Sequence, residues 1–276
     1  MEESVRFRWL GVAGIELSTE QEVLAIDPIF SRPPFREVWF GRIFPDRQLV
    51  AARLPRCSYV LVSHFHWDHL VDVSEVVLNT GATALGPPSS CRLLALLGVP
   101  EDRIQEIRAD DRLELGGFEV QVFRARHASA FQRPIVKGSL PLTLHPLPEA
   151  RDPQMDVAFS FLVEAEGHRL LDWHGATPDS ATPADVLLVD SGKRPLFYQE
   201  LLAEVRPKVV IPTHWDNPFR PLSGSPLTAA APPAWALPPT QRINLTQFRR
   251  TIRRISPTTR VFVPEILRQY DLPHLL

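Results

Sequence analysis

The sequence is short of cysteine and of long apolar segments, and each shortage excludes a class of protein. The two cysteines, Cys57 and Cys91, cannot form a disulfide framework, and neither lies in a metal-binding spacing. We therefore interpret both as small buried hydrophobic residues in a reducing cytoplasm. No apolar run reaches about 18 residues, and the N-terminus has no apolar signal-peptide core, so we expect a cytoplasmic protein without a membrane span.

An excess of charge of either sign is also missing. The formal net charge of −2 gives no electrostatic reason to expect a nucleic-acid partner. Hydrophobic residues make up 44% of the chain, which is ample for a core. Because no linker and no internal repeat is evident, we expect one domain over residues 1–276. The sequence leaves the oligomeric state open.

The chain does contain a crowded group of polar side chains directly after a buried strand. Residues 59–62 read Tyr-Val-Leu-Val, which predicts the strand, and residues 63–70 then read Ser-His-Phe-His-Trp-Asp-His-Leu. Polar side chains at such a place are costly to bury unless something pairs with them. His64 and His66 lie two positions apart in extended chain, so they point the same way and can share one metal ion.

Asp68 and His69 follow this pair as the chain turns away, so they are better placed for a second ion nearby. A solvated, histidine-rich loop is the alternative, but loops rarely follow a buried strand with this mix of ligand types. Two further histidines, His127 and His214, stand where predicted strands end. Each is either a metal ligand or an ordinary strand-end histidine.

Asp27 also closes a predicted strand, over residues 23–26. Its carboxylate either caps a turn or supports a metal-binding histidine from behind, and we favour the turn. His145 lies in an irregular, proline-rich segment over residues 138–153. It could reach the site from there, but a surface role is the commoner use of such a residue.

Alternating strand and helix patterns indicate helices that cover sheets. Short strands open the chain, and a Gly-Gly turn at residues 116–117 predicts a hairpin further on. The predicted strands span residues 5–10, 14–18, 23–26, 59–62, 83–85, 112–115, 118–126, 157–164, 169–171, 186–189, 209–211 and 261–263. The predicted helices span residues 72–79, 195–205 and 245–255, and a fourth runs to residue 97 from a cap at Ser89 or Ser90.

The motif within residues 63–70 reads His-x-His-x-Asp-His, and with it the chain resembles the metallo-β-lactamase superfamily. Residues 9–11 (Trp-Leu-Gly), 27–28 (Asp-Pro) and 212–215 (Pro-Thr-His-Trp) are most similar to the branch that contains ascorbate-phosphate lactonases and N-acyl-phosphatidylethanolamine phospholipase D. The resemblance extends over nearly the whole chain. It implies an α/β fold, a four-layer αββα sandwich with the metals at one edge between two sheets.

The resemblance also implies six metal ligands. These are His64, His66 and His127 for a first ion, and Asp68, His69 and His214 for a second. Nitrogen and oxygen ligands without cysteine fit zinc best, as one or two ions, with manganese or iron as further options. Redox members of the superfamily typically carry glutamate at the second histidine of the motif, so His66 favours hydrolysis over oxygen chemistry.

One departure from the family pattern concerns the aspartate, usually within Gly-Asp-Thr, that bridges the two metals. Residues 175–177 read Gly-Ala-Thr, which places Ala176 at the bridging position. Asp172 or His174 could compensate, because they share one face of a strand that extends so far, or each is a polar residue at a strand end. The departure predicts a second metal that is weakly held or absent.

The mechanism that these residues favour is metal-assisted hydrolysis. Zinc lowers the pKa of bound water from about 16 towards 7, and Asp68 is our candidate to orient that water and accept its proton. We expect a small-molecule or lipid-derived substrate with an ester, lactone or phosphodiester bond. Further contacts with the substrate are expected from Trp67, Trp215, Asp216, Arg220 and the loops over residues 31–45 and 138–153.

Two other interpretations compete with hydrolysis of a small molecule. The first is a metal- or ligand-binding protein that kept the fold and lost turnover, as the missing bridging aspartate suggests. The second is a nuclease of the same superfamily, which the charge balance and the lack of a basic appended domain disfavour.

Overall fold

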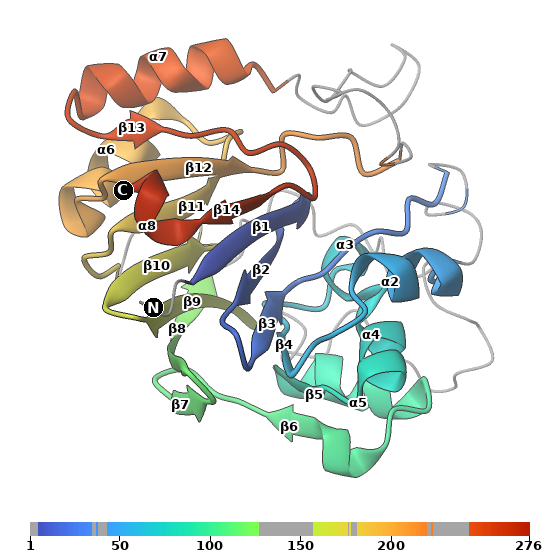
Figure 1. Ribbon diagram of the computed structural model, residues 1–276. Coiled ribbons are helices and arrows are strands. Elements are labelled where there is room, and N and C mark those ends of the chain that lie inside the picture. The colour runs from blue at the N-terminus through green and yellow to red at the C-terminus, as the bar shows by residue number, and fades with distance from the viewer. Residues whose placement is uncertain are drawn as a thin grey trace.

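The computed structural model describes residues 5–34, 37, 43–126, 157–175, 177, 181–219, 222 and 243–276. Within these residues, two mixed sheets pack face to face (Figure 1). The strands of the first sheet are, in order across it, β14 (Gln269–Asp271), β1 (Arg6–Gly11), β2 (Gly14–Ser18), β3 (Val23–Ile26), β4 (Tyr59–Leu61), β5 (Thr83–Gly86) and β6 (Ile104–Glu106). Neighbours are antiparallel from β14 to β3 and parallel from β3 to β6.

The second sheet is built in the same way. Its strands are, in order, β13 (Arg260–Val261), β12 (Val209–Thr213), β11 (Val186–Asp190), β10 (His168–Trp173), β9 (Val157–Ala165), β8 (Phe118–Arg126) and β7 (Arg112–Leu115). Neighbours are parallel from β13 to β10 and antiparallel from β10 to β7. Each sheet therefore contains a parallel part whose strands end at the same edge.

The core between the sheets follows from the alternation of side chains along each strand. In β1, Phe7 and Trp9 point inward and are fully buried, whereas Arg8 lies on the other face. In β8, Val120 and Val122 face the first sheet in the same core cluster. Strand β4 is apolar on both faces, as expected for a parallel strand covered on both sides.

Helices cover the two outer faces. On the first sheet lie α2 (Arg47–Arg53), α4 (Val73–Thr80) and α5 (Pro88–Leu96), and on the second lie α6 (Pro195–Val205) and α7 (Leu245–Ile255) (Figure 1). The side chain of Asp46 begins α2 by accepting a hydrogen bond from Leu49 N, and Gly81 ends α4 with a φ of 73°. The expected α/β fold with four αββα layers is confirmed.

All of the predicted strands and helices are present, several with the predicted ends and the others with ends that differ by one or two residues. The pattern missed the short elements α3 (Trp67–Leu70), α8 (Leu272–Leu275), η1 (Glu101–Arg103), β6 and β14, and also α2. Both cysteines are buried as expected, and burial raises the pKa of each thiol to about 12. Among the described residues, no helix has the length and apolar character that crossing a membrane requires.

Candidate metal centre

The candidate site lies where strands of both sheets end at one edge of the sandwich. In the first sheet, Asp27 follows β3 and His64 follows β4. In the second sheet, His174 follows β10 and His214 follows β12. Strands β3 and β4 are parallel neighbours, and the backbone N–H of Asp27 donates to the carbonyl of Leu61 at 3.0 Å. Apolar strands therefore carry these polar side chains to one place.

Helix α3 turns the motif back towards the sheet. It begins after His66, and the backbone N–H of His69 donates to the carbonyl of His66 at 3.0 Å. This single helical turn places Asp68 and His69 beside the end of β4. His69 is fully buried, whereas the side chain of Asp68 keeps 21% of its surface exposed. Asp68 is therefore open to a small reactant.

His64 and His66 lie with their ring nitrogens close together. Nε2 of His64 lies 2.9 Å from Nδ1 of His66. On the far side of the His64 ring, the hydroxyl of Ser63 lies 2.8 Å from Nδ1 and fixes the orientation of the ring. His127, the third expected member of this set, lies outside the described residues. The role of these residues as ligands stays a prediction.

Asp68, His69 and His214 form a second group of converging donor atoms. Nε2 of His214 lies 3.4 Å from Nε2 of His69, which in turn lies 3.9 Å from a carboxylate oxygen of Asp68. The three donor atoms all lie within 4.8 Å of one another. Two nitrogens that each lie about 2.0–2.1 Å from one tetrahedral zinc ion are roughly 3.3 Å apart, so the spacing of the two histidines fits zinc.

Asp27 is buried directly behind the motif. Its carboxylate accepts hydrogen bonds from the backbone N–H of Ser63 at 2.8 Å and from the Ser63 hydroxyl. Nδ1 of His69 lies 2.6 Å from the same carboxylate, which leaves Nε2 of His69 facing Asp68 and His214. A carboxylate placed in this way orients a metal-binding histidine. The turn-capping role that we favoured for Asp27 is therefore wrong, and the alternative role behind a histidine describes its contacts.

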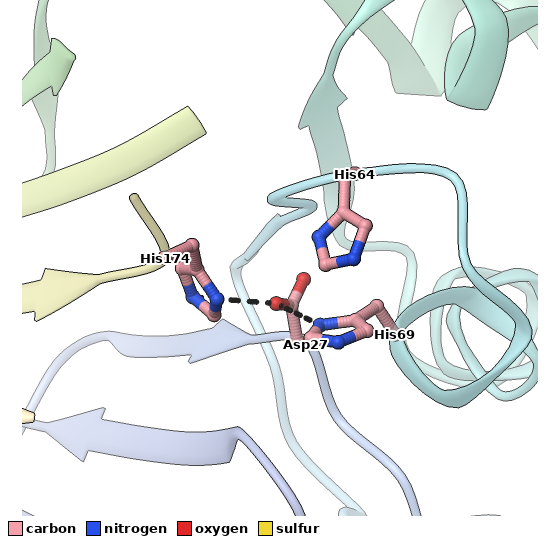
Figure 2. Close-up of side chains that lie close together, drawn as sticks. All are labelled: Asp27, His64, His69 and His174. Atoms are coloured by element: carbon pink, nitrogen blue, oxygen red, sulfur yellow. Dashed lines mark hydrogen bonds and ion pairs between the residues drawn. The ribbon is translucent and has the colours of Figure 1, made fainter. Parts of the chain in front are cut away.

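His174 joins the site from the second sheet, as Figure 2 shows. Its Nε2 lies 2.9 Å from a carboxylate oxygen of Asp172 and 3.7 Å from Asp27. It thus belongs to a buried group with Asp27, His64 and His69 whose donor atoms all lie within 4.8 Å of one another. Of the two residues considered as substitutes for the bridging aspartate, His174 reaches this group and Asp172 stands behind it. Ala176 lies outside the described residues.

Burial and neighbouring charges set the protonation of these groups. Burial lowers the pKa of His69 well below its usual value, and burial likewise lowers the pKa of His66. Both imidazoles are therefore neutral at pH 7, which is the form that binds metals. Burial by itself raises the pKa of Asp68, but His69, His66 and His214 outweigh it and lower the pKa, so Asp68 is a carboxylate. This mixture of neutral imidazoles and a carboxylate fits a divalent cation.

The pKa values of Asp27 and His174 are both raised, but for different reasons. Burial raises the pKa of Asp27, even though His174 and Ser63 act in the opposite direction. For His174, burial alone would lower the pKa, but Asp172 and Asp27 outweigh it and raise the pKa to about 9. Asp172 therefore holds His174 as a cation.

Two of the expected substrate contacts are wrong. Trp215 is buried and stacks on Trp9 with ring centroids 4.6 Å apart, and Asp216 is buried and forms an ion pair with Arg32. Both residues therefore belong to the interior and not to a substrate surface. Trp67 is half-buried beside Phe219 and remains a candidate. Arg220, His145 and the whole of the expected loop over residues 138–153 lie outside the described residues, as does part of the expected loop over residues 31–45.

Sequence reasoning missed Ser63, whose hydroxyl lies against both Asp27 and His64. The residue does stand at the end of a buried strand, where an unpaired hydroxyl is costly, and that is the signal that could have identified it. The buried pair of Asp216 and Arg32 was also missed, because an ion pair between residues 184 positions apart leaves no pattern in the sequence.

Replacing Asp27 by asparagine is expected to weaken zinc binding about 10- to 100-fold, as is typical when the partner behind a ligand is lost. The amide cannot match the carboxylate's interaction with Nδ1 of His69, so the ring loses its fixed orientation. Competition with a chromophoric chelator measures the affinity. Unchanged affinity would show that Asp27 does not orient the ligand.

Comparison with known proteins agrees with this geometry. The chain matches the family model described as beta-lactamase superfamily domain over residues 23–215, a range that includes the motif and His214. A UPF0173 metal-dependent hydrolase of Sinorhizobium medicae is 29% identical over 127 residues, which are 46% of this chain and 49% of the relative. This chain thus spans about half the length of that relative.

Two further matches extend over more of the chain. A UPF0173 metal-dependent hydrolase of Anaeromyxobacter dehalogenans is 27% identical over 235 residues, which are 79% of this chain and 77% of the relative. Among solved structures, Igni18, a metallo hydrolase of Ignicoccus hospitalis, is 16% identical, with a TM-score of 0.58 and coverage of 97% of both chains. This last likeness supports the fold alone.

Proposed function

The chain belongs to the metallo-β-lactamase superfamily, and from this premise we propose that it is a metal-dependent hydrolase. The observation that carries the proposal is the convergence of Asp68, His69 and His214, which come from different sheets yet place their donor atoms within 4.8 Å of one another. Burying imidazoles beside a carboxylate costs free energy unless the groups are paired or bind an ion. An ordinary surface group of acidic residues stays in water and does not incur this cost.

The metal that we propose is zinc, as one or two ions. His64 and His66 would hold one ion together with His127, and Asp68, His69 and His214 would hold the other. The nitrogen and oxygen donors favour zinc, and manganese or iron fits the same set less well. The second ion is proposed to be the weaker, because His174 in place of a carboxylate adds no negative charge between the two sets.

The ion would supply Lewis-acid chemistry, lowering the pKa of water from about 16 towards 7 and polarising the bond under attack. Asp68 would orient the attacking water and accept its proton, since its pKa is lowered and its side chain is partly exposed. Asp27 would keep Nδ1 of His69 occupied, so that the ring keeps one orientation during turnover.

The substrate that we propose is an ester, lactone or phosphodiester of a small or lipid-derived molecule. The half-buried rings of Trp67 and Phe219, which stack on each other beside the motif, support an apolar group on the substrate. They pack against a buried apolar cluster of Val12, Ile29, Ile43 and Val71. Trp67 directly precedes Asp68, so the apolar group would lie beside the reacting bond. These apolar rings favour the branch that contains ascorbate-phosphate lactonases and N-acyl-phosphatidylethanolamine phospholipase D over a nuclease.

A second candidate is a metal-binding protein without turnover. The observation that favours it is His174, whose pKa of about 9 places a positive charge beside the ligand sets and disfavours a second cation there. Catalysis that needs two ions would then fail although one ion is bound.

The test is hydrolysis by zinc-loaded protein of bis(p-nitrophenyl) phosphate, a p-nitrophenyl acyl ester and a lactone. We expect turnover of at least one, its loss in excess chelator, and its recovery on adding zinc. Zinc bound at a defined stoichiometry without turnover of any of the three would favour the metal-binding candidate. No zinc uptake at all would contradict both.

A further inference from the structure

Two residues at the site have a positive φ, a left-handed backbone conformation that residues other than glycine rarely adopt. Val12 has a φ of 50° and His214 a φ of 54°. For a β-branched residue such as valine this is a true outlier. The two are joined, because the backbone N–H of His214 donates to the carbonyl of Val12 at 2.8 Å. Strain of this kind persists only where the surrounding structure enforces it.

Asp216 is placed to enforce it. One oxygen of its carboxylate accepts a hydrogen bond from the backbone N–H of Val12 at 2.9 Å. The other oxygen forms an ion pair with Nη2 of Arg32 at 3.0 Å, and the two side chains are only 6% and 3% exposed. The backbone N–H of Val12 is thus bound to Asp216, and its carbonyl is bound to His214. These two partners lie two positions apart in the chain.

Arg32 is itself held in place. The carboxylate of Asp72 accepts hydrogen bonds from the backbone N–H groups of Phe30 and Ser31, directly ahead of Arg32. Nε and Nη1 of Arg32 have no hydrogen-bond partner among the described residues, so Asp216 is the acceptor that the described part of the chain offers. Gly11 leaves room for this contact, since a Cβ there would lie 2.1 Å from Nη2 of Arg32.

We propose that the Asp216–Arg32 pair is a positioning device for His214, an inference that rests on the proposed metal centre. Asp216 holds Val12 in its left-handed conformation, and Val12 then holds the backbone of His214. The imidazole is aimed so that its Nε2 lies 3.4 Å from Nε2 of His69. Neither Asp216 nor Arg32 touches the ion or the substrate. The pair sets the affinity of the second ligand set by fixing His214 before the metal binds.

The test is Asp216→Asn, which keeps the size of the side chain and an oxygen for Val12 but loses the ion pair. Titration of the apo-protein with zinc against a chromophoric chelator should show at least a tenfold loss of affinity for the weaker ion. His214→Ala removes the ligand itself, so its zinc affinity serves as the reference for a second ligand set that has lost His214. Where Asp216→Asn does not fold, Arg32→Lys should give a smaller loss in the same direction.

Glu16→Gln is the matched control. Glu16 forms a second largely buried ion pair, with Arg8 on β1, and the two side chains are 7% and 20% exposed. Neither residue contacts a ligand. Both Asp216→Asn and Glu16→Gln should lower the melting temperature by a few degrees, but only Asp216→Asn should weaken zinc binding.

A Val12→Gly background distinguishes positioning of His214 from general stabilisation of the fold. Glycine adopts a φ near 50° without steric cost, so Asp216→Asn should lose less zinc affinity in that background than in the wild type. Wild-type affinity in Asp216→Asn, an equal loss in Glu16→Gln, or an equal loss in both backgrounds would each overturn the inference alone. Failure of the wild type to bind zinc would overturn the proposed function and the inference together.

Discussion

His66→Ala is expected to lower zinc affinity at the tighter site by about 100- to 1000-fold. The estimate follows from structural zinc sites, where about 10–16 kcal/mol is shared among four ligands, so that one ligand contributes roughly 2.5–4 kcal/mol. His66 is a good choice because its Nδ1 lies 2.9 Å from Nε2 of His64, the other expected ligand of this ion in the motif. Metal analysis after exhaustive dialysis against a weak chelator measures the loss.

The matched control is His274→Ala. His274 is a largely exposed histidine near the C-terminus, paired with Asp271. Its removal changes the histidine count by one without touching the site, so zinc content should equal that of the wild type. If His66→Ala kept its zinc through dialysis, or if both variants lost the same amount, then His64 and His66 would not form the tighter site.

The sequence predicted the long elements of the fold because their patterns depend on burial. Strand β1 begins with alternating polar and apolar side chains, β12 is an apolar run that ends at a polar residue, and helix α7 has the spacing of a helix with one buried face. The elements that it missed, such as β6 and β14, are three-residue strands at sheet edges. Such strands depend on a partner strand far away in the chain, so no local pattern marks them.

The site shows the same division between local and long-range information. The motif could be recognised because its ligands lie within six positions and point to one face. The two possible roles of Asp27 could be named from the sequence, but the choice between them could not be made. An aspartate at the end of a strand can either cap a turn or pair with a histidine such as His69. The contact between Val12 and Asp216 joins residues 204 positions apart. Only the paired sheets bring these residues together, and the sequence carries no pattern for that pairing.

Proximity along the chain misjudged part of the surface around the site. It placed Trp215 and Asp216 among substrate contacts because they directly follow His214. Chain proximity is a poor guide here, since His214 has a left-handed backbone that turns the next residues inward. Trp215 then stacks on Trp9, and Asp216 pairs with Arg32. The residues after a ligand therefore serve the position of that ligand.

Asp68→Asn is expected to lower kcat by about 100- to 10,000-fold, the range that a positioned acid–base group contributes. The amide is nearly the same size, but it cannot accept the proton of an attacking water. A thousandfold loss corresponds to about 4 kcal/mol in the activation barrier. The effect should appear in kcat more than in KM, because the substrate still meets the rings of Trp67 and Phe219. Steady-state kinetics on whichever chromogenic substrate the zinc-loaded protein turns over measures both.

Loss of metal is the competing explanation, because Asp68 is also a proposed ligand of the second set. The variant is therefore assayed at saturating zinc, with the bound metal measured in the same sample. Asp185→Asn is the control, since Asp185 pairs with Lys208 away from the candidate site and its removal should leave kcat unchanged. A kcat within tenfold of the wild type at full zinc loading would show that another group accepts the proton. A kcat that recovers only as zinc is added would assign to Asp68 the role of ligand alone.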